Sequence, residues 1–375
     1  MPDSIELPMV SNPEPERVED TRAVCLSGGG YRAMLFHLGS LWYLNDAKYL
    51  EKLDRVSSVS GGSITAGVLA INWAALAGQQ FSAGAFNQLV VAPVRKIASR
   101  TIDKPSIFGG LFRRGSISDR VIGYYKDELF GDKTLKHLPD HPRFVINSTN
   151  VQTGSLFRFS KPYIGDYRIG RNLNPTVLVA QAVAASSAFP PVLSPSRIEF
   201  KSTDFSTDPG PLSKPPFNTK IVLTDGGVYD NMGIETAWKR CRTIFVSDGG
   251  GKMQPEENPH ADWARHALRV NDLIDNQVRS LRKRQIVSAF RSKERLGAYW
   301  GMWTDPAEYP VTSQLSLPGD RALDLARTPT RLKKIPDDLQ ERIINFGYGM
   351  AERALRGYFD PAAKAAQAFP YGRGI

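Results

Sequence analysis

Three short glycine-rich stretches contain the residues of this sequence that could carry out covalent chemistry. They are Gly28-Gly29-Gly30, Ser58-Val59-Ser60-Gly61-Gly62 and Asp225-Gly226-Gly227. A serine hydroxyl attacks an acyl carbon when a nearby base takes its proton, and a carboxylate within hydrogen-bond reach can be that base. The three stretches therefore suggest acyl transfer, with Ser60 as the nucleophile and Asp225 as the general base.

The stretch VSSVSGGSITAG, residues 56–67, has the composition of a sharp turn between a strand and a helix. The pattern is close to GxSxG, the nucleophile elbow, in which a strained strand-to-helix turn exposes the serine oxygen. Ser58 stands where that pattern has its first glycine, and the N–H of Gly61 would point to a developing oxyanion. A tight packing corner without chemistry is the alternative interpretation.

The glycine loop in AVCLSGGGYRAMLF, residues 23–36, lies between an expected strand and an expected helix. Glycines allow a tight turn and a helix N-terminus attracts negative charge, so this loop suits a phosphate or a transient oxyanion. No Lys-Ser or Lys-Thr pair follows, so it is not a P-loop, and its spacing is not that of a dinucleotide-binding GxGxxG. A strand–helix turn without chemistry is the alternative here.

The sequence does not point to a histidine as the base for Ser60. None of them follows an expected strand in a glycine-rich turn, and His37 is expected to pack within the first helix. Asp225 comes directly after the apolar run 220–224, at a strand end, where α/β sheets bind their ligands. Asp248, in FVSDGGG, also follows an apolar run and is a rival. Asp225 could also be a turn residue only, because Asp-Gly is a common turn dipeptide.

The elements that must position these residues alternate between strands and helices, which predicts an α/β sheet with helices on both faces. The expected strands are 23–27, 56–59, 143–147, 155–160, 220–224 and 243–247, and the expected helices are 31–45, 63–76 and 233–240. Residues 99–115, 163–174 and 201–216 are expected to be loops, because they are rich in glycine, proline or polar residues.

The chain has 375 residues, of which 41% are hydrophobic and 23% charged, enough for a large folded core. We expect four parts: a flexible leader at 1–20, the α/β catalytic domain at 21–250, a helical extension packed on it at 251–358, and a tail at 359–375. In the extension, residues 261–296 and 336–358 show helical periodicity.

The net charge of +10 favours anionic partners such as a membrane surface. Residues 278–295, VRSLRKRQIVSAFRSKER, carry seven Lys or Arg and one Glu and could rest on anionic lipid, with a solvated helix face as the alternative. The sequence lacks zinc-ligand spacing, an RNP signature and a helix-turn-helix pattern, so nucleic acid is not an expected partner.

Three observations lead us to expect a cytoplasmic protein with at most peripheral membrane contact. The longest apolar run, 64–77, is shorter than the ~20 residues of a membrane span. The first twenty residues lack the basic and apolar regions of a signal peptide. Cys25 and Cys241 show neither disulfide-framework nor metal-ligand spacing.

In their order along the chain, the three stretches resemble the motifs of the patatin-like phospholipases, a family of serine acyl hydrolases with GGGxR, then GxSxG, then DGG or DGA. The segment DGGVYDNMGIE, residues 225–235, is similar to the third motif, which favours Asp225 over Asp248. The resemblance covers residues 21–250, including 147–160 and 184–195. The pieces 328–332 and 347–356 are similar to C-terminal parts of some bacterial members, less specifically.

This resemblance implies a three-layer α/β fold with a central, mostly parallel sheet. It also implies that a Ser60–Asp225 dyad cleaves the acyl esters of membrane phospholipids through an acyl-enzyme, with no metal or other cofactor. The oxyanion hole would come from Gly28, Gly29, Gly30 and Gly61. Arg32 would either bind a substrate phosphate or tie down the start of its helix.

Two departures from the family pattern are conservative in size: Ala33 replaces a frequent glycine, and Ser58 replaces the first glycine of the elbow. Two other functions stay open at this point. One is a lipid- or anion-binding module on the same fold without hydrolysis. The other is an esterase for non-lipid acyl esters or thioesters. The oligomeric state does not follow from the sequence.

Overall fold

The computed structural model describes residues 18–102 and 117–375. Most of the expected leader 1–20 and most of the expected loop 99–115 therefore lie outside the described residues. Glu19 and Asp20 do not belong to a leader, because the first strand already begins at Glu19.

Within the described residues, ten strands form one mixed sheet in the order β10-β9-β1-β2-β3-β4-β5-β6, with β8 also paired to β3 and β7 paired to β8. The strands are β1 (Glu19–Leu26), β2 (Arg55–Val59), β3 (Arg143–Asn150), β4 (Ser155–Phe159), β5 (Ile164–Asp166), β6 (Gly170–Asn172), β7 (Ser196–Glu199), β8 (Lys220–Asp225), β9 (Cys241–Asp248) and β10 (Leu296–Gly301). The run β10-β9-β1-β2-β3 is parallel, in line with the mostly parallel central sheet that was expected, and the remaining pairs are antiparallel.

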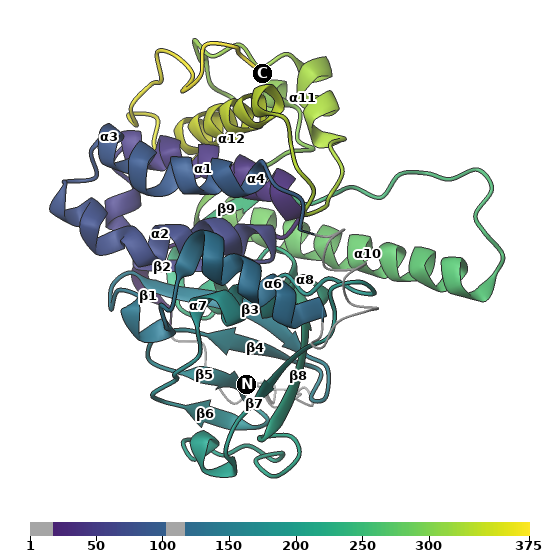
Figure 1. Cartoon of the computed structure of the whole chain (residues 1–375). Helices are drawn as coiled ribbons and strands as arrows, with labels where there is room; N and C mark the ends of the chain where they lie inside the picture. Colours follow the sequence, from purple (N-terminus) through teal and green to yellow (C-terminus); the bar gives the residue numbers. More distant parts are fainter. Residues whose placement is uncertain (1–17, 103–116) are drawn as a thin grey trace, which may run out of the picture.

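Helices cover both faces of the parallel half (Figure 1). They are α1 (Gly30–Asp46), α2 (Gly61–Gly78), α3 (Ala83–Phe86), α4 (Ala92–Ala98), α6 (Ile117–Tyr125), α7 (Val179–Ser186), α8 (Gly227–Asp230), α9 (Glu235–Trp238), α10 (Trp263–Arg291), α11 (Gly319–Ala326) and α12 (Asp337–Tyr358). Shorter turns are η1 (Leu50–Lys52), η2 (Asn87–Val91), η3 (Lys126–Phe130), η4 (Leu135–His137), η5 (Ser202–Phe205) and η6 (Pro306–Glu308).

The alternation of side chains along β1 explains the two helical layers, because successive residues of a strand point to opposite faces. Val24 and Leu26 belong to a large core that includes α1, α2 and α12. Ala23 and Cys25 belong to a smaller core that includes α9 and α10. The three-layer α/β architecture expected from the sequence is therefore confirmed.

Every strand and helix expected from the sequence forms, although β1 begins at Glu19 instead of residue 23 and α9 covers only Glu235–Trp238 of the expected 233–240. Two further expectations were wrong. Residues 163–174 are not a loop, because they form the hairpin of β5 and β6 at the sheet edge. The extension 251–358 is not only helical, because β10 pairs in parallel with β9 and completes the sheet. The side chains of β10 point alternately into the larger and the smaller core. The strand is short and follows α10 after only a few turn residues, so the sequence pattern did not separate it from the helix.

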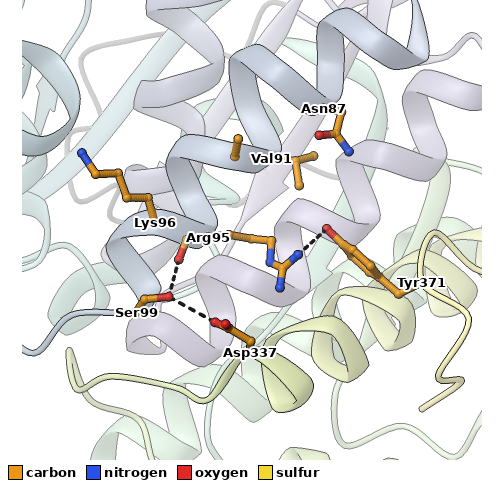
Figure 2. A pocket seen from close by; sticks show the side chains of 8 residues that line it. Asn87, Val91, Arg95, Lys96, Ser99, Asp337 and Tyr371 are labelled. Atoms are coloured by element: carbon orange, nitrogen blue, oxygen red, sulfur yellow. Dashed lines mark hydrogen bonds between the residues drawn. The ribbon is translucent and has the colours of Figure 1, made fainter.

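The C-terminal residues are tied to the core of the protein. Arg95 of α4 donates to the Tyr371 hydroxyl at 3.1 Å (Figure 2), and Asn345 of α12 donates to the Tyr371 carbonyl at 2.8 Å. A cavity of about 280 Å³ opens beside these contacts, and neither Ser60 nor Asp225 lines it.

Helix α2 is the one described helix that is long and apolar enough to cross a membrane, by length and composition only. Two-thirds of its residues are buried inside the protein, where α2 packs against α1 and the sheet. Burial of this kind is typical of the central helix of an α/β core, and the helix begins directly after Ser60.

Candidate active site

Ser60 lies between the end of β2 and the start of α2 in a strained backbone conformation. Its φ of 50° and ψ of −119° fall in a region that non-glycine residues rarely occupy and that costs of order 1–3 kcal/mol. A serine at this position usually caps the helix with its side chain. The Ser60 hydroxyl makes no such hydrogen bond to the helix that follows, so it remains available to another partner.

A set of buried serines holds this turn in place. The backbone N–H of Ser60 donates to Ser186 Oγ at 3.0 Å, and Ser186 Oγ lies 2.9 Å from Ser63 Oγ. Ser63 in turn donates to the Ser58 hydroxyl at 3.0 Å. The Ser58 hydroxyl therefore takes part in this hydrogen-bonded set, at the position where the usual pattern has a glycine. Ser63 and Ser186 were not predicted from the sequence, although Ser186 lies in the small-residue segment 184–195.

Asp225 reaches Ser60 because two strands meet end to end beside β3. Strand β2 runs parallel to the first half of β3 and places Val59 opposite Asn147. Strand β8 runs antiparallel to the second half and places Asp225 opposite Ser148, the next residue of β3. The ends of β2 and β8 therefore point at each other. The sequence predicts that Asp225 lies at a strand end, and in the structure this strand runs antiparallel to β3.

The Asp225 carboxyl is buried, with 2% of the residue exposed. Oδ1 accepts the Gly227 N–H at 2.7 Å, whereas Oδ2 has no hydrogen-bond partner in the described part of the chain. Burial raises the pKa of Asp225 to about 7, and the Gly227 N–H and the Ser60 hydroxyl lower it in part. No hydrogen bond with Ser60 satisfies Oδ2, but the Ser60 hydroxyl lies near enough to Asp225 to lower its pKa.

Two helix N-termini converge on the Ser60 turn. The backbone of Gly61, at the start of α2, packs directly against that of Gly30, at the start of α1, and a Cβ on Gly61 would overlap the Gly30 carbonyl. Gly29 and Gly30 have φ values of 141° and 60°, in the region that favours glycine. No described residue accepts a hydrogen bond from the N–H of Gly29, Gly30 or Gly61. These N–H groups can therefore serve an anion.

Two loop residues have different contacts from those that the sequence suggested. The N–H of Gly28 donates to the Asn231 carbonyl at 2.9 Å, so it is not available to an oxyanion. Arg32 does not reach toward a substrate, because its guanidinium is buried and donates to the carbonyls of Ala326 at 2.8 Å, Thr328 at 2.7 Å and Gly249 at 3.1 Å. Of the two roles considered, Arg32 has the structural one.

The other candidates for a base are occupied elsewhere. His37 is buried with Nε2 2.9 Å from the Ser27 carbonyl and Nδ1 2.8 Å from Ser247 Oγ, and burial lowers its pKa to about 4. Asp248 accepts from the Tyr299 hydroxyl at 2.8 Å and lies 3.6 Å from the Arg279 guanidinium. Its pKa is lowered, because the neighbouring arginine and these donors outweigh burial. Among the residues described, no three His, Cys, Asp or Glu side chains gather as a metal site requires.

Asn231 is a site residue that sequence reasoning missed. Its carbonyl accepts from Gly28, and its side-chain oxygen lies so close to Gly28 and Gly227 that a Cβ on either would collide with it. Asn231 therefore joins the glycine loop to the turn after Asp225. Its position within the DGGVYDNMG segment was the available signal.

The arrangement combines a strained, uncapped serine hydroxyl, a buried carboxyl with an open oxygen, and unpaired N–H groups at two helix starts. Such a set can activate a nucleophile, accept its proton and stabilise a negative oxygen.

Comparison with protein families finds that residues 24–238 match the model described as patatin-like phospholipase. No curated protein matches the chain at a significant level. Among solved structures, human GIVD cytosolic phospholipase A2 is 15% identical, with a TM-score of 0.48 over 90% of this chain and 57% of that one. In another structure of that enzyme the match covers 49% of its length, so the chain spans about half of it. VipD from Legionella pneumophila is 13% identical, with a TM-score of 0.36 over 91% of this chain and 67% of that one. The family assignment rests on the family match alone.

Proposed function

Because the chain belongs to the patatin-like phospholipase family, whose members are typically serine hydrolases, we propose that it cleaves the acyl esters of membrane phospholipids. The observation that carries the proposal is the meeting of β2 and β8, which brings a strained serine and a buried carboxyl together. A base beside a serine hydroxyl that is not tied up in other hydrogen bonds is what ester cleavage by a serine requires.

In the proposed acylation step, Ser60 Oγ attacks the ester carbonyl carbon while Asp225 accepts the hydroxyl proton. The carbonyl oxygen becomes an oxyanion, which the N–H groups of Gly29, Gly30 and Gly61 stabilise. The bond between the carbonyl carbon and the leaving alkoxide then breaks, and the alkoxide takes the proton from Asp225. The acyl group remains on Ser60.

In the proposed deacylation step, water attacks the acyl carbon and Asp225 accepts its proton. Collapse of the second oxyanion breaks the bond to Ser60 Oγ, which recovers the proton from Asp225. A fatty acid leaves, and the dyad returns to its starting state. The raised pKa of Asp225 suits a group that must both accept and return a proton near neutral pH.

The pH dependence of the rate follows from this role of Asp225. The carboxyl must be ionised to accept the Ser60 proton, and its pKa is about 7. We therefore expect kcat/KM for a soluble short-chain ester to rise as the pH increases through about 7 and to level off above it. The measurement is an initial-rate profile in buffers of constant ionic strength. A rate that is constant from pH 5 to 9 would contradict Asp225 as the base.

Exposed apolar side chains next to the dyad support a lipid substrate. Phe189, which is 60% exposed, follows Ala188, whose carbonyl accepts the Asp225 N–H. Val228, which is 53% exposed, comes directly after Gly227. Apolar side chains left in water at the rim of a site favour an apolar ligand.

Helix α10 supports contact with a membrane, but through a different part than the sequence suggested. Within 278–295, four cations form an ion pair or a ring contact with the protein itself, and the other three, Arg284, Arg291 and Lys293, are exposed and form neither within the described residues. The engaged ones pair with Asp248 and Glu235 or stack on the rings of Tyr299 and Trp238, and they are Arg279, Arg282, Lys283 and Arg295. The C-terminal half of α10 therefore mainly attaches the helix to the rest of the protein.

The N-terminal half of α10 projects from the body of the protein (Figure 1), and an exposed apolar face runs along the helix from Trp263 to Leu281. Trp263, Val270, Ile274 and Leu281 are 86%, 41%, 54% and 52% exposed. Their spacing of seven, four and seven residues places them on one face of the helix. The helix packs near α8, which begins two residues after Asp225, so we propose that this face lies on the lipid surface that supplies the substrate.

We expect the double variant Trp263→Ser with Ile274→Ser to bind phosphatidylcholine–phosphatidylglycerol vesicles about tenfold more weakly or worse, because two apolar side chains no longer enter the lipid. Vesicle sedimentation measures this. Hydrolysis of a soluble ester should not change, and Leu323→Ser, which alters an exposed leucine on α11, is the matched control. Equal vesicle binding by the double variant and the wild type would exclude this face.

The substrate class is tested by comparing phospholipid vesicles, soluble acyl esters and thioesters at matched concentrations. Release of fatty acid from vesicles, faster than from soluble esters, supports the proposal. Turnover of only the soluble esters or thioesters would point to the esterase alternative. Vesicle binding without turnover of any ester would point to a binding module. We also propose a cytoplasmic location with peripheral membrane contact, which cell fractionation tests.

A further inference from the structure

A second cavity, of about 80 Å³, lies away from the Ser60 turn and is lined mainly by cations. No acidic side chain lines it. Its six basic lining residues are Arg55, Arg143, Arg158, Arg171, Lys239 and Arg240. A cavity of this composition repels cations and attracts anions.

The register of the sheet brings these side chains together. Arg55 at the start of β2 pairs with Arg143 at the start of β3, so both side chains point to the same face. In the antiparallel strands, Arg158 and Arg171 are both cross-strand partners of Gly165, which has no side chain to separate them. Lys239 and Arg240 come from the turn between α9 and β9, on the face that α9 covers.

The acidic neighbours balance only part of this charge. Lys239 pairs with Glu235 at 2.9 Å, and Arg171 pairs with Asp208. Arg55 and Arg143 form no ion pair with any residue in the described ranges, and Arg55 Nε is buried without a hydrogen-bond partner there. Burial and the neighbouring Arg55 lower the pKa of Arg143. Holding like charges together in this way costs stability unless an anion joins them.

We propose that this cavity binds a soluble anion that bears a phosphate group, such as a phosphate monoester or a diphosphate. An arginine guanidinium can donate two parallel hydrogen bonds to two oxygens of one phosphate group. Arg55 and Arg143 are neighbours across β2 and β3, so both can bind the same phosphate. The volume suits one phosphate group, with the rest of the ligand outside. The Tyr163 ring, 6.0 Å from the Arg143 guanidinium, adds a flat wall against which an attached organic group can lie.

The place of the cavity in the fold favours a ligand from solution over a lipid headgroup. Arg55 begins β2 and Ser60 follows the last residue of β2, so the two sites lie toward opposite ends of that strand. When the Ser60 side of the sheet faces a membrane, the cavity faces away from it. The proposal does not depend on the hydrolytic function, because none of the cavity residues belongs to the dyad or its oxyanion donors.

The test is a titration of the full chain with inorganic pyrophosphate, and separately with inorganic phosphate, by calorimetry in phosphate-free buffer of constant ionic strength. We expect saturable binding at one site by the wild type, with affinity reduced at least tenfold in Arg143→Gln and in Arg55→Gln. The matched control is Arg284→Gln, which removes an exposed arginine of α10 and should bind as the wild type does. Absence of saturable binding, or equal loss in all three variants, would overturn the proposal, the latter by indicating nonspecific charge attraction.

Thermal unfolding separates a binding role from a structural one. In anion-free buffer, Arg143→Gln should unfold at the same temperature as the wild type or higher, because it relieves repulsion. Pyrophosphate should raise the unfolding temperature of the wild type and not that of the variant. A variant that is destabilised and still shifted by pyrophosphate would overturn the proposal. Phosphatidic acid vesicles form a third arm, and binding to them alone, without binding of pyrophosphate, would also overturn it.

Discussion

We expect the Ser60→Ala protein to lose about 10⁴-fold or more of its kcat toward phospholipid vesicles while remaining folded. The substitution removes only the hydroxyl group, which does not cap α2. The turn is held by the hydrogen bond from the backbone N–H of Ser60 to Ser186, which alanine can also make. Fatty-acid release and thermal unfolding, measured on the same preparation, test the two halves of this expectation. The matched control is Ser288→Ala, at an exposed position of α10.

A second substitution at this position distinguishes a nucleophile elbow from a packing corner. Ser60→Gly should be as inactive as Ser60→Ala but more stable by about 1 kcal/mol, because glycine adopts a φ of 50° without strain. A gain of stability would show that the serine is held in a strained conformation, and the loss of activity would show that its hydroxyl is required. Full activity in either variant would refute Ser60 as the nucleophile.

We expect Asp225→Asn to lower kcat by about 10³-fold or more, because an amide cannot accept the Ser60 proton. The asparagine oxygen can still accept the Gly227 N–H, so the turn after β8 should stay intact. Rates toward a soluble ester at pH 8 measure the effect, since the wild-type carboxyl is ionised there. The comparison variant is Asp248→Asn. If Asp248→Asn abolished turnover and Asp225→Asn did not, the rival aspartate would be the base.

The same substitution should make the protein more stable at pH 8. The pKa of Asp225 is about 7 in the folded protein and near 3.8 in an unfolded chain, so the folded state favours the protonated form. Its destabilising effect is absent below about pH 4, grows as the pH rises to about 7, and is complete above it, on the order of 4 kcal/mol. Asp225→Asn should therefore gain stability at pH 8 and none at pH 4. Urea unfolding at the two pH values measures this, and an equal effect at both would show that Asp225 is not buried as described.

The sequence by itself determined the local features of this protein. Alternating and periodic apolar residues predicted the main strands and long helices, because these patterns depend on near neighbours in the chain. The elbow at Ser60 and the glycine loop at 28–30 are also local, since each is a turn between a strand and the helix that follows it. The family resemblance was carried by these local motifs and is confirmed by the match over residues 24–238. The short strands β5, β6, β7 and β10 were not predicted, because they are stabilised by their partners in the sheet.

Only the tertiary structure decided which of these local features come together. Asp225 lies beside Ser60 because β8 pairs with β3 along the same edge as β2, starting where the pairing with β2 ends. The residues that pair in this way are far apart in the chain. Arg32 turned out to be a structural tie because the carbonyls of Ala326 and Thr328 reach it from the C-terminal part. The basic cavity exists because arginines from separate strands share one register. Such contacts depend on long-range packing, which no short sequence window encodes.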